Sequence, residues 1–94
     1  MTVYAIVQVD VRDADEYAKY AALAGPAVAK FGGAFLARGG AVEVKEGTSR
    51  DRCVIIQFDD METARTFYHS PDYQAALAFA LPVSERDYKF VQGL

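Results

Sequence analysis

Alternation of apolar and polar residues predicts four short strands. The stretches VYAIVQVDV (3–11), AFLAR (34–38) and RCVIIQF (52–58) are largely apolar and are bounded by charged residues or glycine, which is typical of strands. RDYKFVQGL (86–94) alternates in the same way and predicts a fourth strand at the end of the chain. AVEVKEG (41–47) alternates too, and we expect it to continue the second strand or to form a hairpin arm.

Helical spacing of apolar residues predicts a long helix over 12–31. Asp13, followed three residues later by Glu16, has the pattern of a capping box at its start. Gly25-Pro26 is expected to interrupt the helix, because proline lacks the backbone donor and disfavours helical geometry before it. Gly32-Gly33 is expected to end it.

A second helical region follows the third strand. Asp59 and Glu62 resemble another capping box, at the start of METARTFYH. Ser70 then has the position of an N-cap for a further helix, with Pro71 at its first helical position.

The element order β-α-β-β-α-β predicts a ferredoxin-like α+β sandwich, with an antiparallel sheet that carries its helices on one face. We expect residues 1–94 to form one such domain. The first strand is apolar on both sides: Val3, Ala5, Val7 and Val9 alternate with Tyr4 and Ile6. Because a water-facing sheet face would carry polar residues, we expect a second copy of the chain to cover it in a homodimer.

Composition narrows the environment and the partners. A net charge of −3 without a basic cluster argues against nucleic-acid binding. Cys53 is the only cysteine, which excludes an internal disulfide and fits a reducing compartment. The sequence lacks the pattern of a secretory signal and has no apolar run of about 18 residues. We therefore expect a cytoplasmic protein that has no membrane or nucleic-acid partner.

Three of these stretches also occur together in a known family. YAKYAALAGPAVAKFGGAFLARGG, then EVKEG, then VIIQFDDMETARTFYHSPDYQ resemble the domain of unknown function 1330 family over essentially the whole chain. The resemblance implies a dimeric α+β barrel, in which two ferredoxin-like sheets pair and the helices lie outside. Relatives in that superfamily include cofactor-free monooxygenases of aromatic polyketides, muconolactone-type isomerases and haem-binding enzymes. The resemblance implies none of these reactions in particular.

Arg38 is the first candidate for ligand binding. The glycines of GGAFLARGG follow a predicted helix and flank a predicted strand, so they do not fit a phosphate loop. Arg38 is either a solvated charge or the partner of Glu43 or Glu46 in an ion pair, or else it anchors a carboxylate, enolate or phenolate at the mouth of a pocket. Glu46 is correspondingly either an ordinary turn carboxylate or a general base.

His69, Tyr20 and Tyr73 are the other candidates. His69 is the only histidine, and it either interacts with a helix C-terminus or acts as a general base. Tyr20 and Tyr73 are either packing residues or pocket residues whose phenols orient an aromatic or carbonyl ligand. Because His69 has no ligating partners at metal-site spacing, we expect neither a metal nor a haem, and no other cofactor.

Two functions are compatible with these residues. The first is a cofactor-free isomerase- or monooxygenase-like enzyme that acts on a small aromatic or acidic metabolite. In it Arg38 would bind an anionic oxygen, and His69 or Glu46 would move a proton. The second is a non-catalytic, dimeric module that binds a small molecule.

Overall fold

The computed structural model describes residues 1–94, and its elements follow the predicted order. The strands are β1 (Val3–Val11), β2 (Ala34–Arg38), β3 (Arg52–Phe58) and β4 (Ser84–Gln92). The helices are α1 (Ala14–Lys30), α2 (Met61–His69) and α3 (Pro71–Ala80), and a 3-10 turn, η1 (Leu81–Val83), leads into β4.

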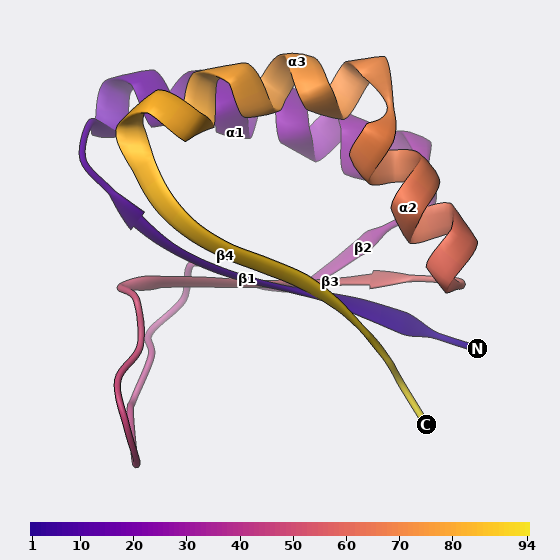
Figure 1. Ribbon diagram of the computed structural model, residues 1–94, viewed down its shortest axis with the longest axis horizontal. Helices are drawn as coiled ribbons and strands as arrows, with labels where there is room; N and C mark the ends of the chain where they lie inside the picture. The colour runs from indigo at the N-terminus through magenta and orange to yellow at the C-terminus, as the bar shows by residue number, and fades with distance from the viewer.

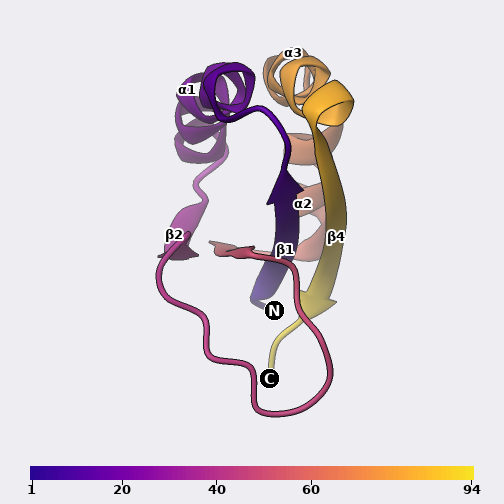
Figure 2. The same ribbon diagram turned by 90° about the vertical axis from the view of Figure 1, so that its left-hand side faces the viewer.

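The four strands form one antiparallel sheet in the order β2-β3-β1-β4. Figures 1 and 2 show the three helices on one face of the sheet, whereas the opposite face is open in this protomer. In both views α1 lies on the side of β2, and α3 lies on the side of β4. The predicted ferredoxin-like α+β fold is therefore confirmed.

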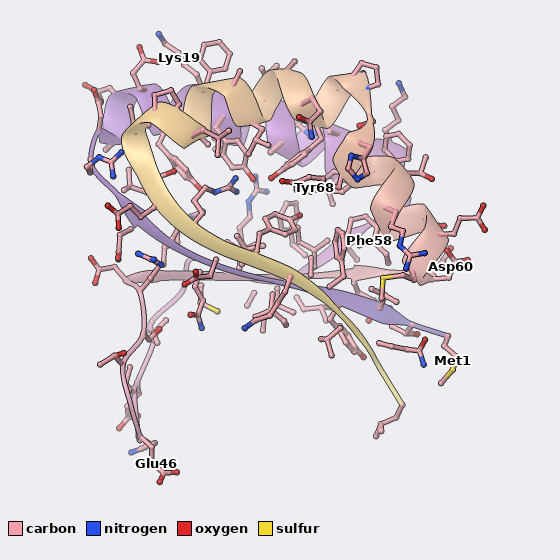
Figure 3. The ribbon with its side chains drawn as sticks, viewed as in Figure 1. Met1, Lys19, Glu46, Phe58, Asp60 and Tyr68 are labelled. Carbon is pink, nitrogen blue, oxygen red and sulfur yellow. The ribbon has the colours of Figure 1, made fainter.

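The hydrophobic core lies between the helices and the sheet. The apolar residues on the covered side of β1 are almost fully buried, as their alternation predicts: Val3, Ala5, Val7 and Val9. Phe67 of α2 packs on Phe58 of β3 and on Tyr73 of α3, with ring centroids 5.0 and 4.6 Å apart. Figure 3 shows Phe58 and Tyr68 in this layer between helices and sheet. These aromatic contacts join all three elements.

The helix N-termini agree with the predicted caps in two cases out of three. Asp13 and Ser70 cap α1 and α3 as expected. The cap of α2 is Asp60, whose carboxylate accepts a hydrogen bond from the backbone N–H of Thr63. The prediction of Asp59 was wrong by one residue, because Asp60 stands directly before the first helical residue.

Helix α1 continues through Gly25-Pro26, so the predicted interruption was wrong. Pro26 removes one helical hydrogen bond, the one to the carbonyl of Ala22. Pro26 and Ala22 are both exposed, so water can bond to the freed carbonyl. Ala24 and Ala27 on either side are buried in the core, and their packing outweighs the loss of one hydrogen bond.

Residues 39–51 form an extended loop, in which the expected strand or hairpin arm over 41–47 is absent. No strand lies beside this stretch to exchange backbone hydrogen bonds, and every residue from 39 to 49 is exposed. The loop projects away from the helices, past the open face of the sheet (Figures 1 and 2), and Glu46 lies near its tip (Figure 3).

The open face of the sheet carries an apolar cluster. Tyr4 of β1 pairs with Val91 of β4, and Ile6 of β1 pairs with Ile55 of β3. None of these four side chains is buried in the protomer. The sheet is therefore apolar on both faces, as the sequence predicts.

Candidate functional site

A narrow hollow lies between α1, α3 and the covered face of the sheet, with a cavity volume of about 30 Å³, enough for one or two water molecules. Its walls are mostly apolar, from residues such as Val7, Ala24, Val28, Val54 and Ile56. The polar residues of the lining are two arginines and three tyrosines: Arg38, Arg52, Tyr17, Tyr20 and Tyr73. Three predicted site residues, Arg38, Tyr20 and Tyr73, therefore share one cavity.

Arg38 and Arg52 lie on the β2–β3 side of this cavity. Arg38 is the last residue of β2, and its guanidinium stacks on the ring of Phe35 at 4.1 Å from the centroid. Neither arginine forms a hydrogen bond or ion pair with another residue, and the Nε of Arg52 is buried without a partner. The expected pairing of Arg38 with Glu43 is not formed, because Glu43 pairs with Lys45.

Two glycines make room for these guanidinium groups. Gly39 has a φ of +74°, and a Cβ at this position would collide with the guanidinium of Arg52. A Cβ at Gly25 in α1 would stand 3.1 Å from Nη2 of Arg38. Gly25 and Gly39 thus let the two arginines lie close to the backbone at the cavity.

Arg86 of β4 lies outside the lining of this cavity, and it holds two tyrosine hydroxyls that belong to the lining. Its Nη2 donates to the hydroxyl of Tyr20 at 2.8 Å and to that of Tyr73 at 3.3 Å. The two hydroxyls also bond to each other at 3.1 Å. Arg86 stacks on the Tyr20 ring at 4.7 Å from its centroid, and its Nε is buried without a partner.

Local structure explains why these groups meet. The Oγ of Ser70 accepts a hydrogen bond from the backbone N–H of Tyr73 and donates one to the carbonyl of Phe67. This cap fixes the first turn of α3, and Tyr73 is almost fully buried. Arg86 pairs in register with Val9 of β1, so it projects from the covered face as Val9 does.

Burial keeps the tyrosines of this site neutral. Burial raises the pKa of Tyr73 to about 12, and it also raises the pKa of Tyr20 and of Tyr88. Tyr88 follows Arg86 on the same side of β4, and its hydroxyl is buried without a hydrogen-bond partner. At neutral pH the phenols therefore form hydrogen bonds and do not act as bases.

His69 and Glu46 do not join this cavity. His69 is the exposed last residue of α2, and its ring packs edge-on against Tyr68. Glu46 is exposed near the tip of the 39–51 loop, on the other side of the sheet (Figure 3). Neither lines the hollow, so the structure does not bring the two predicted proton-transfer residues together with Arg38.

Arg52 and Arg86 were not among the predicted site residues. Each stands in a run of charges, RDR at 50–52 and ERD at 85–87, which reads as solvent-exposed surface. A signal was present nonetheless. Arg52 lies two residues before Val54, and Arg86 lies two residues before Tyr88. Residues two apart in a strand share a face, so each arginine shares a face with apolar residues.

The chemistry of the cavity follows from this set of groups. The lining contains no Asp, Glu or His, so neither a carboxylate nor an imidazole can serve as a general base there. The arginines stay protonated, and they are arranged with neutral phenols. Such a set favours a negatively charged oxygen, whether in a ground-state anion or in a charge that develops during a reaction.

The fold and this cavity define a small ferredoxin-like α+β protein with a hollow between its helices and sheet. The chain belongs to the DUF1330 family, a domain of unknown function, whose model matches residues 2–94. A comparison with curated proteins finds no match. None of the helices combines the length and the hydropathy that crossing a membrane requires.

Solved structures share the fold at low sequence identity. A Jannaschia protein, described as a dimeric ferredoxin-like protein of unknown function, superposes with a TM-score of 0.79 at 12% identity, over 99% of this chain and 100% of that one. A Rhodopseudomonas palustris protein of unknown function gives 0.74 at 17%, over 99% and 82%. SnoaB of Streptomyces nogalater, described as a cofactor-independent oxygenase, gives 0.70 at 14%, over 99% and 93%. These likenesses establish the fold.

Proposed function

We propose that the protein binds a small organic anion at the mouth of the cavity between α1, α3 and the sheet. The observation that carries this proposal is the pair of arginines in the cavity lining, Arg38 and Arg52, neither of which pairs with a carboxylate of the protein. Uncompensated cations at an apolar hollow favour an anionic ligand over a neutral one.

Benzoate and benzamide form a matched pair of probes, since they share a ring and differ in charge. We expect calorimetry to show benzoate binding at least about tenfold more tightly, because a hydrogen bond to a charged group contributes about 1.5–3 kcal/mol. Arg38→Gln removes most of this preference. Arg65→Gln, at an exposed arginine of α2 outside the cavity, leaves it unchanged. Equal affinity for the two probes would refute the proposal.

A cofactor-free enzyme is the second candidate function, and the likeness to a protein described as a cofactor-independent oxygenase favours it. Without a carboxylate or imidazole in the cavity, such an enzyme would need a substrate acidic enough to ionise on its own, with the arginines stabilising the anion. 1-Phenylbutane-1,3-dione is a suitable probe because its enolate absorbs in the ultraviolet. Enolate formation below the solution pKa of the probe, with uptake of dioxygen, supports the enzyme; enolate formation without turnover supports binding alone.

The open face of the sheet supports a homodimer in this proposal. Tyr4, Ile6, Ile55 and Val91 together form an apolar cluster that the protomer leaves uncovered, and the Jannaschia protein of the same fold is described as dimeric. A two-fold contact would bury this cluster against its own copy. Sedimentation equilibrium should give twice the chain mass, and a monomer at micromolar concentration would contradict the contact.

A further inference from the structure

Arg38 and Arg52 are close neighbours on the covered face of the sheet. Arg38 of β2 pairs with Val54 of β3, and Arg52 precedes Val54 by two residues in the same strand. The two arginines therefore occupy diagonal positions, with Cα atoms about 7–8 Å apart. The guanidinium of Arg52 lies against Gly39, the residue that follows Arg38. Both side chains line the same hollow, so two positive charges share one small region.

No negative charge of the chain compensates this pair. Like charges at neighbouring positions of a sheet repel each other, and an arginine does not relieve the repulsion by losing its proton. Glu43 pairs with Lys45, and Asp51 forms no ion pair with Arg52; neither acidic residue lines the hollow. The chain as a whole carries a net charge of −3, so the pair is a local exception. An anion from outside the chain would neutralise both cations.

The size of the hollow and the number of charges narrow the class of this anion. A volume of about 30 Å³ admits a head group of only a few atoms, and the rest of the ligand would lie outside. A carboxylate carries one negative charge, and the fork of a single guanidinium engages both its oxygens. A phosphoryl group has three terminal oxygens, and a phosphate monoester is mostly doubly charged at neutral pH because its second pKa is about 6.

We propose that the anionic group of the ligand is a phosphoryl group, as in a phosphate monoester, bound between Arg38 and Arg52 at the mouth of the hollow. This inference rests on the proposed function and specifies its substrate class. Each guanidinium donates hydrogen bonds to phosphoryl oxygens, and two negative charges neutralise two positive ones. A free phosphate ion offers the same chemistry, and the probes distinguish the two sources.

Methyl phosphate and methyl sulfate form a matched pair, because both are tetrahedral with three terminal oxygens and they differ in charge. Each is titrated into the full chain by calorimetry at pH 7.5 and fixed ionic strength. We expect methyl phosphate to bind about tenfold more tightly, because its second charge strengthens the hydrogen bonds from both arginines. Equal binding would overturn the inference. Inorganic phosphate is the third probe: tighter binding than methyl phosphate supports the phosphoryl contact with the free ion as its source, and weaker binding supports an ester.

The pH dependence separates charge from shape. The titratable groups of the lining besides the arginines are Tyr17, Tyr20 and Tyr73, phenols that keep their protons between pH 5.5 and 8. Only the ligand therefore changes its protonation at the site. The affinity of methyl phosphate should rise about threefold over this range as its second proton leaves, whereas that of methyl sulfate stays constant. A constant affinity for methyl phosphate would contradict a contact with the dianion.

Arginine variants locate the contact. Arg38→Gln and Arg52→Gln each leave one positive charge, so each should reduce the preference for methyl phosphate to less than about twofold. Arg65→Gln, at an exposed position outside the lining, should keep the preference in full. If Arg52→Gln does not fold, Arg52→Met supplies an apolar chain at the same position and is measured instead. A preference that survives in both cavity variants would contradict the assignment.

Failure of the proposed function has a different signature. In that case benzoate binds no better than benzamide, and neither methyl ester binds. A preference for benzoate over benzamide, together with equal binding of methyl phosphate and methyl sulfate, refutes only the phosphoryl group.

Discussion

The two faces of the sheet carry arginines in opposite settings at the same end of the strands. On the open face, Arg50 has a side chain only 28% exposed, and it pairs with Asp10 at 2.9 Å, Asp87 at 2.8 Å and Glu85 at 3.5 Å. On the covered face, Arg52 and Arg86 flank Val9 without a single carboxylate. Arg50 lies in the loop before β3, whereas Arg52 is the first residue of that strand, so the two cations lie on opposite faces although only one residue separates them in the sequence.

This contrast separates an arginine that is neutralised by carboxylates of the chain from arginines that have no such partner and that we propose bind a ligand. Arg50 joins the end of the 39–51 loop to β1 and β4 through hydrogen bonds to Asp10 and Asp87, and these carboxylates neutralise its charge. The arginines of the covered face, Arg38 included, are placed by glycines and tyrosines, which supply no negative charge.

The sharpest test removes both free guanidinium groups at the cavity. Arg38→Gln combined with Arg52→Gln should weaken benzoate binding at least about a hundredfold, because each charged hydrogen bond contributes about 1.5–3 kcal/mol. Arg12→Gln combined with Arg65→Gln removes the same net charge from the surface and should change affinity by less than about twofold. Calorimetry at fixed ionic strength compares the two. Equal losses would mean that overall charge, and not the cavity, governs binding.

The covered face should lose stability in alkali. Burial raises the pKa of Tyr73 from 10.0 to about 12, so the folded state keeps a proton that the unfolded state releases between these values. Its contribution, about 3 kcal/mol, is present below pH 10 and is lost as the pH rises towards 12. Urea unfolding between pH 8 and 11.5 should show a steeper decline for the wild type than for Tyr73→Phe. Parallel curves would contradict a buried neutral phenol.

The open face should lose stability in acid. The backbone N–H of Asp51 and the guanidinium of Arg50 lower the pKa of Asp10 below 3.8. The unfolded chain therefore takes up the proton first, and the contribution present above pH 3.8 is lost as the pH falls through the lowered pKa. Thermal unfolding followed from pH 6 to pH 2.5 should show Asp10→Asn converging on the wild type at the acid end. A constant difference would exclude the carboxylate as the source.

Replacing each kind of arginine by methionine should affect stability in opposite ways. Arg50→Met leaves Asp10, Asp87 and Glu85 facing one another without a cation, and the unfolding midpoint should fall. Arg86→Met leaves no charge behind, because Tyr20 and Tyr73 still bond to each other. Its free energy of unfolding should stay constant or rise by about 1 kcal/mol at most. A larger loss at Arg86 than at Arg50 would overturn the division between the faces.

The fold was predictable because its signals are local and repeated. Alternation along β1, the Gly32-Gly33 pair after α1 and the Ser70-Pro71 helix start each fixed an element without knowledge of the rest. The break at Pro26 was mispredicted because the sequence pattern does not show how much packing α1 gains on the sheet. The loop over 39–51 was mispredicted because alternation alone does not supply a neighbouring strand.

The site was only partly predictable, because it depends on register between distant strands. Arg38, Tyr20 and Tyr73 could be chosen from local spacing. Arg52 and Arg86 become neighbours of Val9 only through the pairing of β3 and β4 with β1, and neighbouring acidic residues mask them in the sequence. The proton-transfer roles of His69 and Glu46 stay predictions, and the cavity of the protomer gives them no support.

Gly25 offers the finest test, because it lies inside α1 and close to Arg38. Gly25→Ala adds a single methyl group there. The new Cβ would stand 3.1 Å from Nη2 of Arg38 and push the guanidinium from its seat, so benzoate affinity should fall about threefold. Gly40→Ala, which meets no atom within 4 Å, should leave affinity unchanged. A variant that binds benzoate as tightly as the wild type would show that Arg38 does not need the space beside Gly25.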